Sequence, residues 1–179
     1  MCSSDLRHDT ADFMSVEGIG KVKAVQLAVI CELTKRISRL RYRDDHAFCT
    51  SEDIAYYYRE ELKGLMHEEV HVMMLDTRYH MITEKCLTRG TVNSSPADPR
   101  DIFIYALKYN AVSIVLVHNH PSGDATPSRQ DIDFTKRVID AGNNIGIRVL
   151  DHIIIGFDNY TSIIDYAGMG RDTYGHVHL

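Results

Sequence analysis

The sequence predicts an α/β domain from about residue 51, preceded by a small helical hairpin segment with a linker over residues 1–50. Helix-like and strand-like segments alternate after residue 51, which is typical of a layered α/β domain. Residues 112–118 read VSIVLVH, a continuous β-branched run that is typical of a strand buried on both faces. The 179 residues suffice for one such core and a small appendage.

The first region contains one predicted helix. After the glycines at 18 and 20, apolar residues recur at helical spacing, which predicts a helix over about residues 21–40. Residues 41–50 are polar and aperiodic, so we expect a linker there. Residues 1–6, MCSSDL, resemble the translation of a common sequencing adapter. We therefore expect these six residues to be non-native and the natural protein to begin further upstream.

The second region, residues 51–179, reads as helices and strands in alternation. Pro99 suits the first turn of a helix, and Gly142 is expected to end another. The predicted helices are 51–66, 99–110 and 131–141, and the predicted strands are 70–76, 80–91, 112–118, 147–157 and about 160–164.

Composition excludes several classes of protein. No apolar run is long enough for a membrane span, and the N-terminus lacks the layout of a secretory signal. The cysteines are scattered without a CxxC pair, which favours reduced thiols in a cytoplasmic protein and excludes cysteine-rich zinc sites. They are Cys2, Cys31, Cys49 and Cys86.

Charge is unevenly spread along the chain. Residues 13–43 hold seven basic and two acidic residues, so this segment carries +5, and the rest must carry −10 to give the net charge of −5. A basic segment on an acidic body is typical of a nucleic-acid contact, and equally of a solvated helix face.

A candidate metal site follows the buried strand, in residues 117–131, VHNHPSGDATPSRQD. His118 and His120 are two residues apart in an extended segment, so both imidazoles face the same way. Ser128 is a natural N-cap, which places Asp131 in the first turn of the next helix. Three such ligands leave a fourth tetrahedral position open, as in catalytic zinc sites. We expect one Zn²⁺ per chain; iron or manganese also suits these ligands, and an ordinary loop is the alternative.

The same residues carry a family resemblance. HNHPSGDATPSRQD fits the H-x-H-P-x6-S-x2-D signature of JAMM (JAB/MPN+) metalloproteases at every fixed position. PRDIFIYALKYNA before it and LDHIIIG after it are similar to the bacterial RadC family. The resemblance implies a three-layer, cytidine-deaminase-like α/β fold, and zinc bound by His118, His120 and Asp131. It further implies that Ser128 hydrogen-bonds the zinc water or the developing oxyanion.

Such a site needs a carboxylate that moves a proton. In the JAMM pattern this glutamate lies upstream, just before a strand, which leaves Glu68 and Glu69 as candidates and Glu84 as an outsider. In RadC-like chains the glutamate precedes the acidic residue at the strand end by eight positions. Counting back from Asp76 selects Glu68.

Residues 67–71, HEEVH, also match the H-E-x-x-H zincin signature. That signature requires a continuous helix, whereas the residues that follow are strand-like, so we do not favour a zincin site. His67 and His71 are instead expected to be partly exposed at a helix–strand junction. His152 is expected to lie at a strand end or core edge, outside the site. The deaminase motif P-C-x-x-C does not occur.

VEGIGKVKA, residues 16–24, resembles a helix-hairpin-helix motif. Its glycines, Gly18 and Gly20, would let backbone N–H groups approach a phosphate, and Lys21 and Lys23 would add charge. This predicts a non-specific DNA contact. A tight turn between packed helices, or a protein contact, would use the same residues.

The sequence therefore favours a zinc-dependent peptidase or isopeptidase that acts on a peptide or protein, with Glu68 as base. The alternative is a DNA-repair-associated accessory protein with a structural or vestigial zinc site. A third hypothesis is a domain that holds a protein without cutting it. We expect no membrane partner and a bacterial cytoplasmic location.

Overall fold

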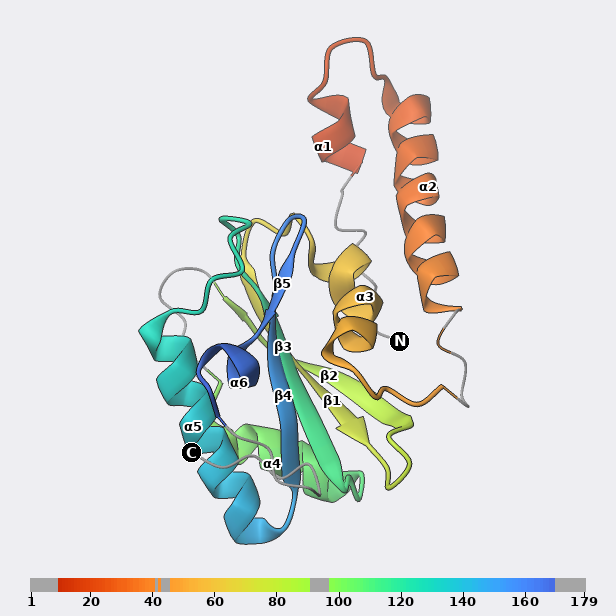
Figure 1. The fold of residues 1–179 in the computed structure, drawn as a ribbon. Coiled ribbons are helices and arrows are strands. Elements are labelled where there is room, and N and C mark those ends of the chain that lie inside the picture. The colour runs from red at the N-terminus through yellow and green to blue at the C-terminus, as the bar shows by residue number, and fades with distance from the viewer. Residues whose placement is uncertain (1–9, 41, 43–45, 91–96, 170–179) are drawn as a thin grey trace. The chain divides into compact units, whose positions relative to one another are not determined.

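The computed structural model describes residues 10–40, 42, 46–90 and 97–169, which form two compact units, 1–43 and 44–179 (Figure 1). The expectation for residues 1–6 falls outside the described part. None of the helices described is long and apolar enough to cross a membrane.

Within its described residues, the first unit contains two helices, α1 (Thr10–Met14) and α2 (Lys21–Arg39). Between them Gly18 adopts a left-handed backbone conformation, with φ of +86°, which glycine reaches without steric cost. Gly20 is the N-cap of α2 and offers no side-chain acceptor, so no side chain satisfies the first N–H groups of this helix.

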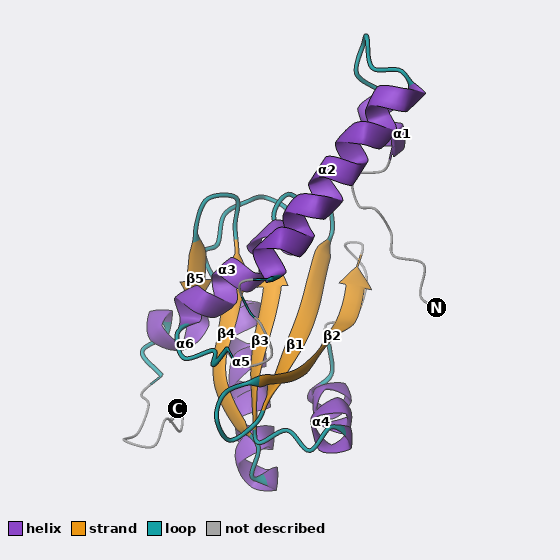
Figure 2. Cartoon of the chain, turned by 90° about the vertical axis from the view of Figure 1, so that its right-hand side faces the viewer, coloured by secondary structure: helices purple, strands orange, loops and turns teal. Residues whose placement is uncertain are grey.

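The second unit is built on a five-stranded sheet in the order β2-β1-β3-β4-β5, in which only β3 and β4 are parallel (Figure 2). The strands are β1 (Glu68–Leu75), β2 (Met81–Gly90), β3 (Ser113–Asn119), β4 (Arg148–Ile155) and β5 (Tyr160–Ser162).

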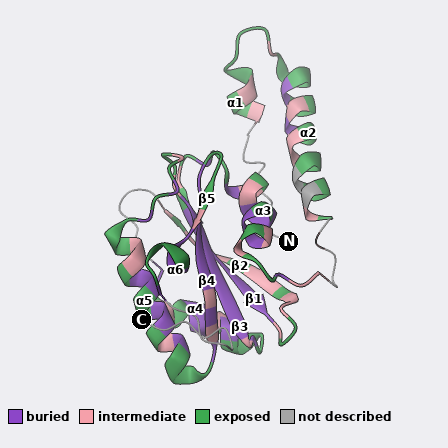
Figure 3. Ribbon diagram, viewed as in Figure 1, coloured by how far each residue is buried: buried purple, intermediate pink, exposed green. Residues whose placement is uncertain are grey.

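Helices cover both faces of this sheet. One face carries α3 (Ser51–Leu62), and the other carries α4 (Pro99–Lys108), α5 (Arg129–Ile145) and the short α6 (Ile163–Tyr166). All seven residues of β3 are buried, as the β-branched run predicts (Figure 3). The expected three-layer α/β domain, preceded by a helical segment, is confirmed.

Alternation along β1 sends neighbouring side chains to opposite faces. Val70, Val72 and Met74 join the core formed with α4 and α5. His71, between them, packs edge-on against Tyr58 of α3. Each of the two faces of β1 therefore carries its own set of side chains.

Several element boundaries differ from the prediction. β1 begins at Glu68, so Glu68 and Glu69 lie in the strand and not before it. Residues 160–164 were predicted as a strand, but only Tyr160–Ser162 form β5, and Ser162 then caps α6.

The predicted linker also differs in its last residues. Phe48 is buried, with its ring against Tyr57. The end of this segment therefore belongs to the second unit and packs within it.

Gly142 lies inside α5 and not at its end, which corrects the predicted helix boundary. The helix continues to Ile145 and is capped by Gly146 in the left-handed conformation, with φ of +75°. A Cβ at Gly142 would lie 2.5 Å from the backbone oxygen of Ile147 and 3.2 Å from the ring of Phe103. Gly142 is therefore needed for close packing.

Substitution Gly142→Ala is expected to destabilise the protein by about 1–3 kcal/mol, because the overpacked core outweighs the better helix propensity of alanine. The exposed neighbour Asn143 provides the control, since Asn143→Ala adds no contact. Chemical denaturation measures both. Equal stability of the two variants would show that the space around Gly142 adapts.

Candidate metal centre

The three predicted metal ligands lie close together. His118 is the last residue but one of the buried strand β3, His120 follows that strand, and Asp131 lies in the first turn of α5. The Nε2 atoms of the two histidines are 3.1 Å apart. Each lies 3.5 Å from an oxygen of Asp131, His118 from Oδ1 and His120 from Oδ2.

The loop between β3 and α5 is held in place by main-chain contacts. Gly123 N donates to His120 O at 2.9 Å, and Phe157 N donates to Gly123 O at 3.0 Å. Gly123 has φ of +80°, and a Cβ there would overlap the ring of Phe157. Glycine at this position therefore lets the loop turn tightly and keeps His120 beside His118.

Asp131 is oriented by a capping box. The backbone N–H of Ser128 donates to Asp131 Oδ2 at 2.8 Å, and Asp131 N donates to Ser128 Oγ at 3.2 Å. Ser128 is thus the N-cap of α5, as the sequence predicts. The reciprocal bonds fix one carboxylate oxygen of Asp131, while Oδ1 faces His118.

A buried hydrogen-bond chain determines which nitrogen of His118 carries the proton. Thr135 Oγ1 donates to the carbonyl of Asp131 at 2.6 Å, so it must accept from His152 Nδ1 at 2.7 Å. His152 Nε2 then accepts from His118 Nδ1 at 2.8 Å. The Nε2 atom of His118 is therefore unprotonated and directed at the centre.

A single backbone contact places a proton on Nδ1 of His120 as well. Its Nδ1 lies 2.7 Å from the carbonyl of Asp124, which can only accept, so the proton is on Nδ1. In its neutral form His120 therefore presents a bare Nε2, which lies 3.1 Å from the Nε2 of His118. A tetrahedral ion with bonds of about 2.0–2.1 Å separates its nitrogen ligands by about 3.3 Å. The donor set therefore fits a small divalent cation.

The local electrostatics keep two ligands ready to bind. Burial lowers the pKa of His118 to about 4, so this imidazole is neutral at neutral pH. Burial opposes ionisation of Asp131, but hydrogen bonds with His120 and Ser128 hold its pKa well below the usual range. The hydrogen bond to Asp131 raises the pKa of His120, so a cation displaces a proton there.

Glu68 is the one of the three candidate glutamates that lies at this centre. Val70 pairs directly with His118, and Glu68 lies on the same face of β1 as Val70. Partial burial and the charge of Asp131 raise the pKa of Glu68. Glu69 points to the other face, and Glu84 pairs with Met73 further along the hairpin. The catalytic role of Glu68 stays a prediction.

His152 corrects the sequence-based interpretation, which placed it outside the site. It is buried in β4 and contacts His118 directly. Burial lowers its pKa far below the usual value, so it is neutral and its Nε2 can accept the hydrogen bond that His118 Nδ1 donates. The parallel register of β3 and β4, which brings these two rings together, is not encoded in local sequence.

The histidines of the HEEVH segment also differ from expectation. Glu68–Leu75 is a strand, so a helical zincin site is excluded. His71 was predicted to be partly exposed, but only 3% of its surface is accessible. With Glu69 and Cys86 it forms a second group that could hold a metal ion.

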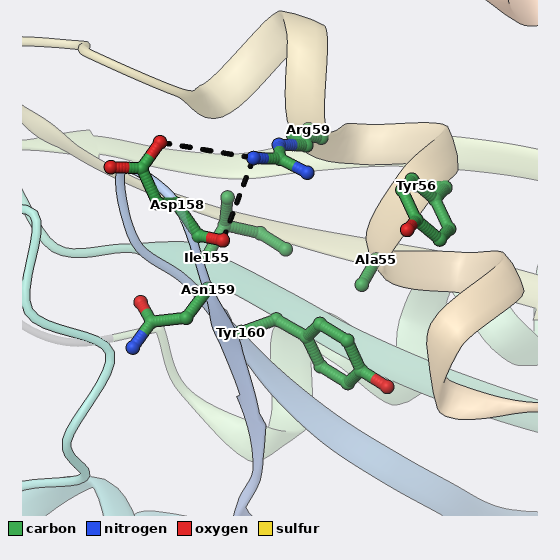
Figure 4. A pocket seen from close by; sticks show the side chains of 7 residues that line it. All are labelled: Ala55, Tyr56, Arg59, Ile155, Asp158, Asn159 and Tyr160. Atoms are coloured by element: carbon green, nitrogen blue, oxygen red, sulfur yellow. Dashed lines mark hydrogen bonds and ion pairs between the residues drawn. The ribbon is translucent and has the colours of Figure 1, made fainter.

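A pocket lies elsewhere, between α3 and the β4–β5 turn, and holds none of these ligands (Figure 4). Arg59 extends across it toward Asp158, with Nη2 at 3.5 Å from the backbone oxygen of Asp158. Tyr56 and Tyr160 supply aromatic rings to its walls.

The predicted nucleic-acid residues belong to the first unit. Gly18 and Gly20 precede α2, and Lys21 and Lys23 are exposed in its first turn. Their position is as the sequence predicts, and a role in binding DNA stays a prediction.

Comparison with known proteins identifies relatives across most of the chain. The RadC-like JAB domain family matches residues 48–169. A UPF0758 protein of Clostridium kluyveri is 41% identical over 155 residues, covering 87% of this chain and 68% of the relative. A UPF0758 protein of Geobacillus sp. is 44% identical over 152 residues, covering 85% of this chain and 67% of the relative. One of Latilactobacillus sakei is 43% identical over 155 residues, covering 87% of this chain and 69% of the relative.

Replacing His152 by phenylalanine is expected to weaken Zn²⁺ binding at this centre by about 10–100-fold, because His118 loses the acceptor that fixes its tautomer. Competition with a chromophoric chelator measures the affinity. His80→Phe, which changes a partly exposed histidine of the turn before β2, serves as control. Unchanged affinity in His152→Phe would contradict the proton order described above.

Proposed function

Since this chain belongs to the RadC-like JAB domain family, we propose that it is a metal-dependent hydrolase, with Zn²⁺ as its ion and an amide bond of a peptide or protein as its target. One observation carries the proposal: the Nε2 atoms of His118 and His120 lie 3.1 Å apart, and each lies 3.5 Å from an oxygen of Asp131. Three nitrogen and oxygen ligands with an open fourth position are typical of catalytic zinc sites.

A cation held by His118, His120 and Asp131 supplies Lewis acidity and a water whose pKa is lowered to ~7. Glu68 lies beside these ligands, and its raised pKa brings it closer to the working pH of a proton acceptor and donor. We assign to Glu68 the transfer of a proton from the attacking water to the leaving amine.

Ser128 is suited to a second task. Its Oγ accepts from Asp131 N, so its hydroxyl hydrogen is available to donate, and the side chain is exposed to an incoming substrate. We propose that it stabilises negative charge developing on the scissile carbonyl oxygen. The loop that holds His120 also holds Ser128, so ligand and donor are positioned together.

The location of this activity is proposed from two features. The described cysteines Cys31, Cys49 and Cys86 are free thiols, and the relatives are bacterial. We propose the bacterial cytoplasm.

The DNA-associated accessory role is kept as a second candidate because of one feature of α2. Its first N–H groups lack a side-chain cap, and exposed Lys21 and Lys23 lie beside them. This combination suits a phosphate.

Substitution Glu68→Gln is expected to lower amide hydrolysis by about 10²–10⁴-fold, since the proton acceptor is lost while the shape is kept. Metal content should not change, because Glu68 is not a ligand. A peptide-library cleavage screen followed by mass spectrometry measures turnover, with the exposed Glu60→Gln as control. Full activity in Glu68→Gln would remove Glu68 from the mechanism.

The double variant Lys21→Ala with Lys23→Ala is expected to weaken binding to duplex DNA and to flatten its salt dependence by about two phosphate contacts. Fluorescence anisotropy at several salt concentrations measures both. Lys63→Ala with Lys108→Ala removes the same charge from the second unit and should leave binding unchanged. Equal losses of DNA affinity in both double variants would show that binding depends on net charge and not on the position of the two lysines.

A further inference from the structure

We propose that Glu69, His71 and Cys86 form a second metal site, for a thiophilic divalent cation such as Zn²⁺, on the sheet face opposite to the first centre. The proposal does not depend on the hydrolase function. It accounts for a buried acidic group, an imidazole and a thiol that the proposed mechanism leaves without a role.

The spacing of the three donors fits a tetrahedral ion. Glu69 Oε2 lies 3.0 Å from His71 Nε2 and 3.8 Å from Cys86 Sγ. One ligand atom from each residue lies within 4.8 Å of the other two. Around Zn²⁺, bond lengths of about 2.0–2.3 Å give separations of about 3.3 Å between N and O, and about 3.5 Å between S and O.

The strand register brings these residues together. Glu69 and His71 are two residues apart on β1 and therefore share a face, and His71 pairs with Cys86 of β2. Glu68 and Val70 point to the other face, toward His118. The two candidate centres thus lie on opposite sides of one strand, and neither shares a ligand with the other.

Burial makes the second group unlike a surface cluster. The side chain of Glu69 is 0% exposed and that of His71 is 4% exposed. A buried carboxylate is costly unless its charge is compensated. Cys86 is only partly buried, which leaves a route for an ion from solvent.

Partners outside the three donors fix the carboxylate. His67 Nε2 lies 2.8 Å and Arg89 Nε 3.5 Å from Oε1 of Glu69, which leaves Oε2 to His71 and Cys86. Asn119 Oδ1 accepts from the backbone N–H of Glu69 at 2.9 Å. Outer contacts of this kind orient metal-bound carboxylates.

The charges of the group also suit a cation. Burial opposes protonation of His71, but its hydrogen bonds to Cys86 and Glu69 outweigh this and raise its pKa to about 8. Burial opposes ionisation of Cys86, whereas the hydrogen bond with His71 lowers its pKa. A thiolate and a carboxylate would balance the charge of a divalent ion held by these three side chains.

The arrangement does not suit a catalytic Cys–His–Glu relay. A relay needs the imidazole between thiol and carboxylate, with one ring nitrogen for each. Here a single oxygen, Oε2 of Glu69, contacts both the ring nitrogen and the sulfur. The three donors converge on one another, as ligands do.

Titration with Co²⁺ tests the second site, because thiolate ligation gives a near-ultraviolet sulfur-to-cobalt charge-transfer band. The first centre has only nitrogen and oxygen donors and gives no such band. We expect the band in the wild-type chain and, unchanged, in His118→Ala with His120→Ala. We expect its loss in Cys86→Ser, an affinity at least about tenfold weaker in Glu69→Gln, and no change in the control Cys49→Ser.

A second measurement uses the wild-type chain alone. Zn²⁺ should slow alkylation of Cys86 by iodoacetamide about tenfold or more, and leave that of the exposed Cys49 unchanged, as read by peptide mass spectrometry. No cobalt band in the wild-type chain, a band that survives Cys86→Ser, or no protection of Cys86 would overturn the proposal. Loss of hydrolysis in His118→Ala with the band intact would separate the two centres.

Discussion

The direction of one buried hydrogen-bond chain determines the character of the candidate active site. A backbone carbonyl of Asp131 can only accept, so each donor in the series Thr135, His152 and His118 must point toward it. The chain ends at the bare Nε2 of His118, directed at the carboxylate of the same Asp131. Two ligands from different elements are thereby linked, and the imidazole is held in the tautomer that binds a cation.

This constraint depends on the middle of the fold. The parallel pairing of β3 with β4 brings His152 beside His118, and packing of α5 brings Thr135 to His152. The two faces of the same sheet carry different candidate sites, because alternation along β1 directs Glu68 to the first centre and Glu69 to the second group. A shift of β1 by one residue would exchange these two glutamates.

Local signals made much of this predictable from the sequence. The β-branched run predicted the buried strand, and the fixed gaps from His118 to Asp131 predicted a strand end, a turn and a capped helix. The missing parts depend on contacts between distant residues. The place of His152 in the site follows from the parallel register of β3 and β4. The place of Cys86 follows from the register of the β1–β2 hairpin, which contains two irregularities. Gly142 resembles a helix end in the sequence, and only its packing against Phe103 and Ile147 shows why glycine is there.

The most direct test is the tautomer of His118 in the metal-free protein, measured by long-range ¹⁵N–¹H correlation of the imidazole rings. We expect a proton on Nδ1, a bare Nε2, and a large shift of the Nε2 resonance when one equivalent of Zn²⁺ is bound. A proton on Nε2, or a resonance that Zn²⁺ leaves unchanged, would contradict this expectation.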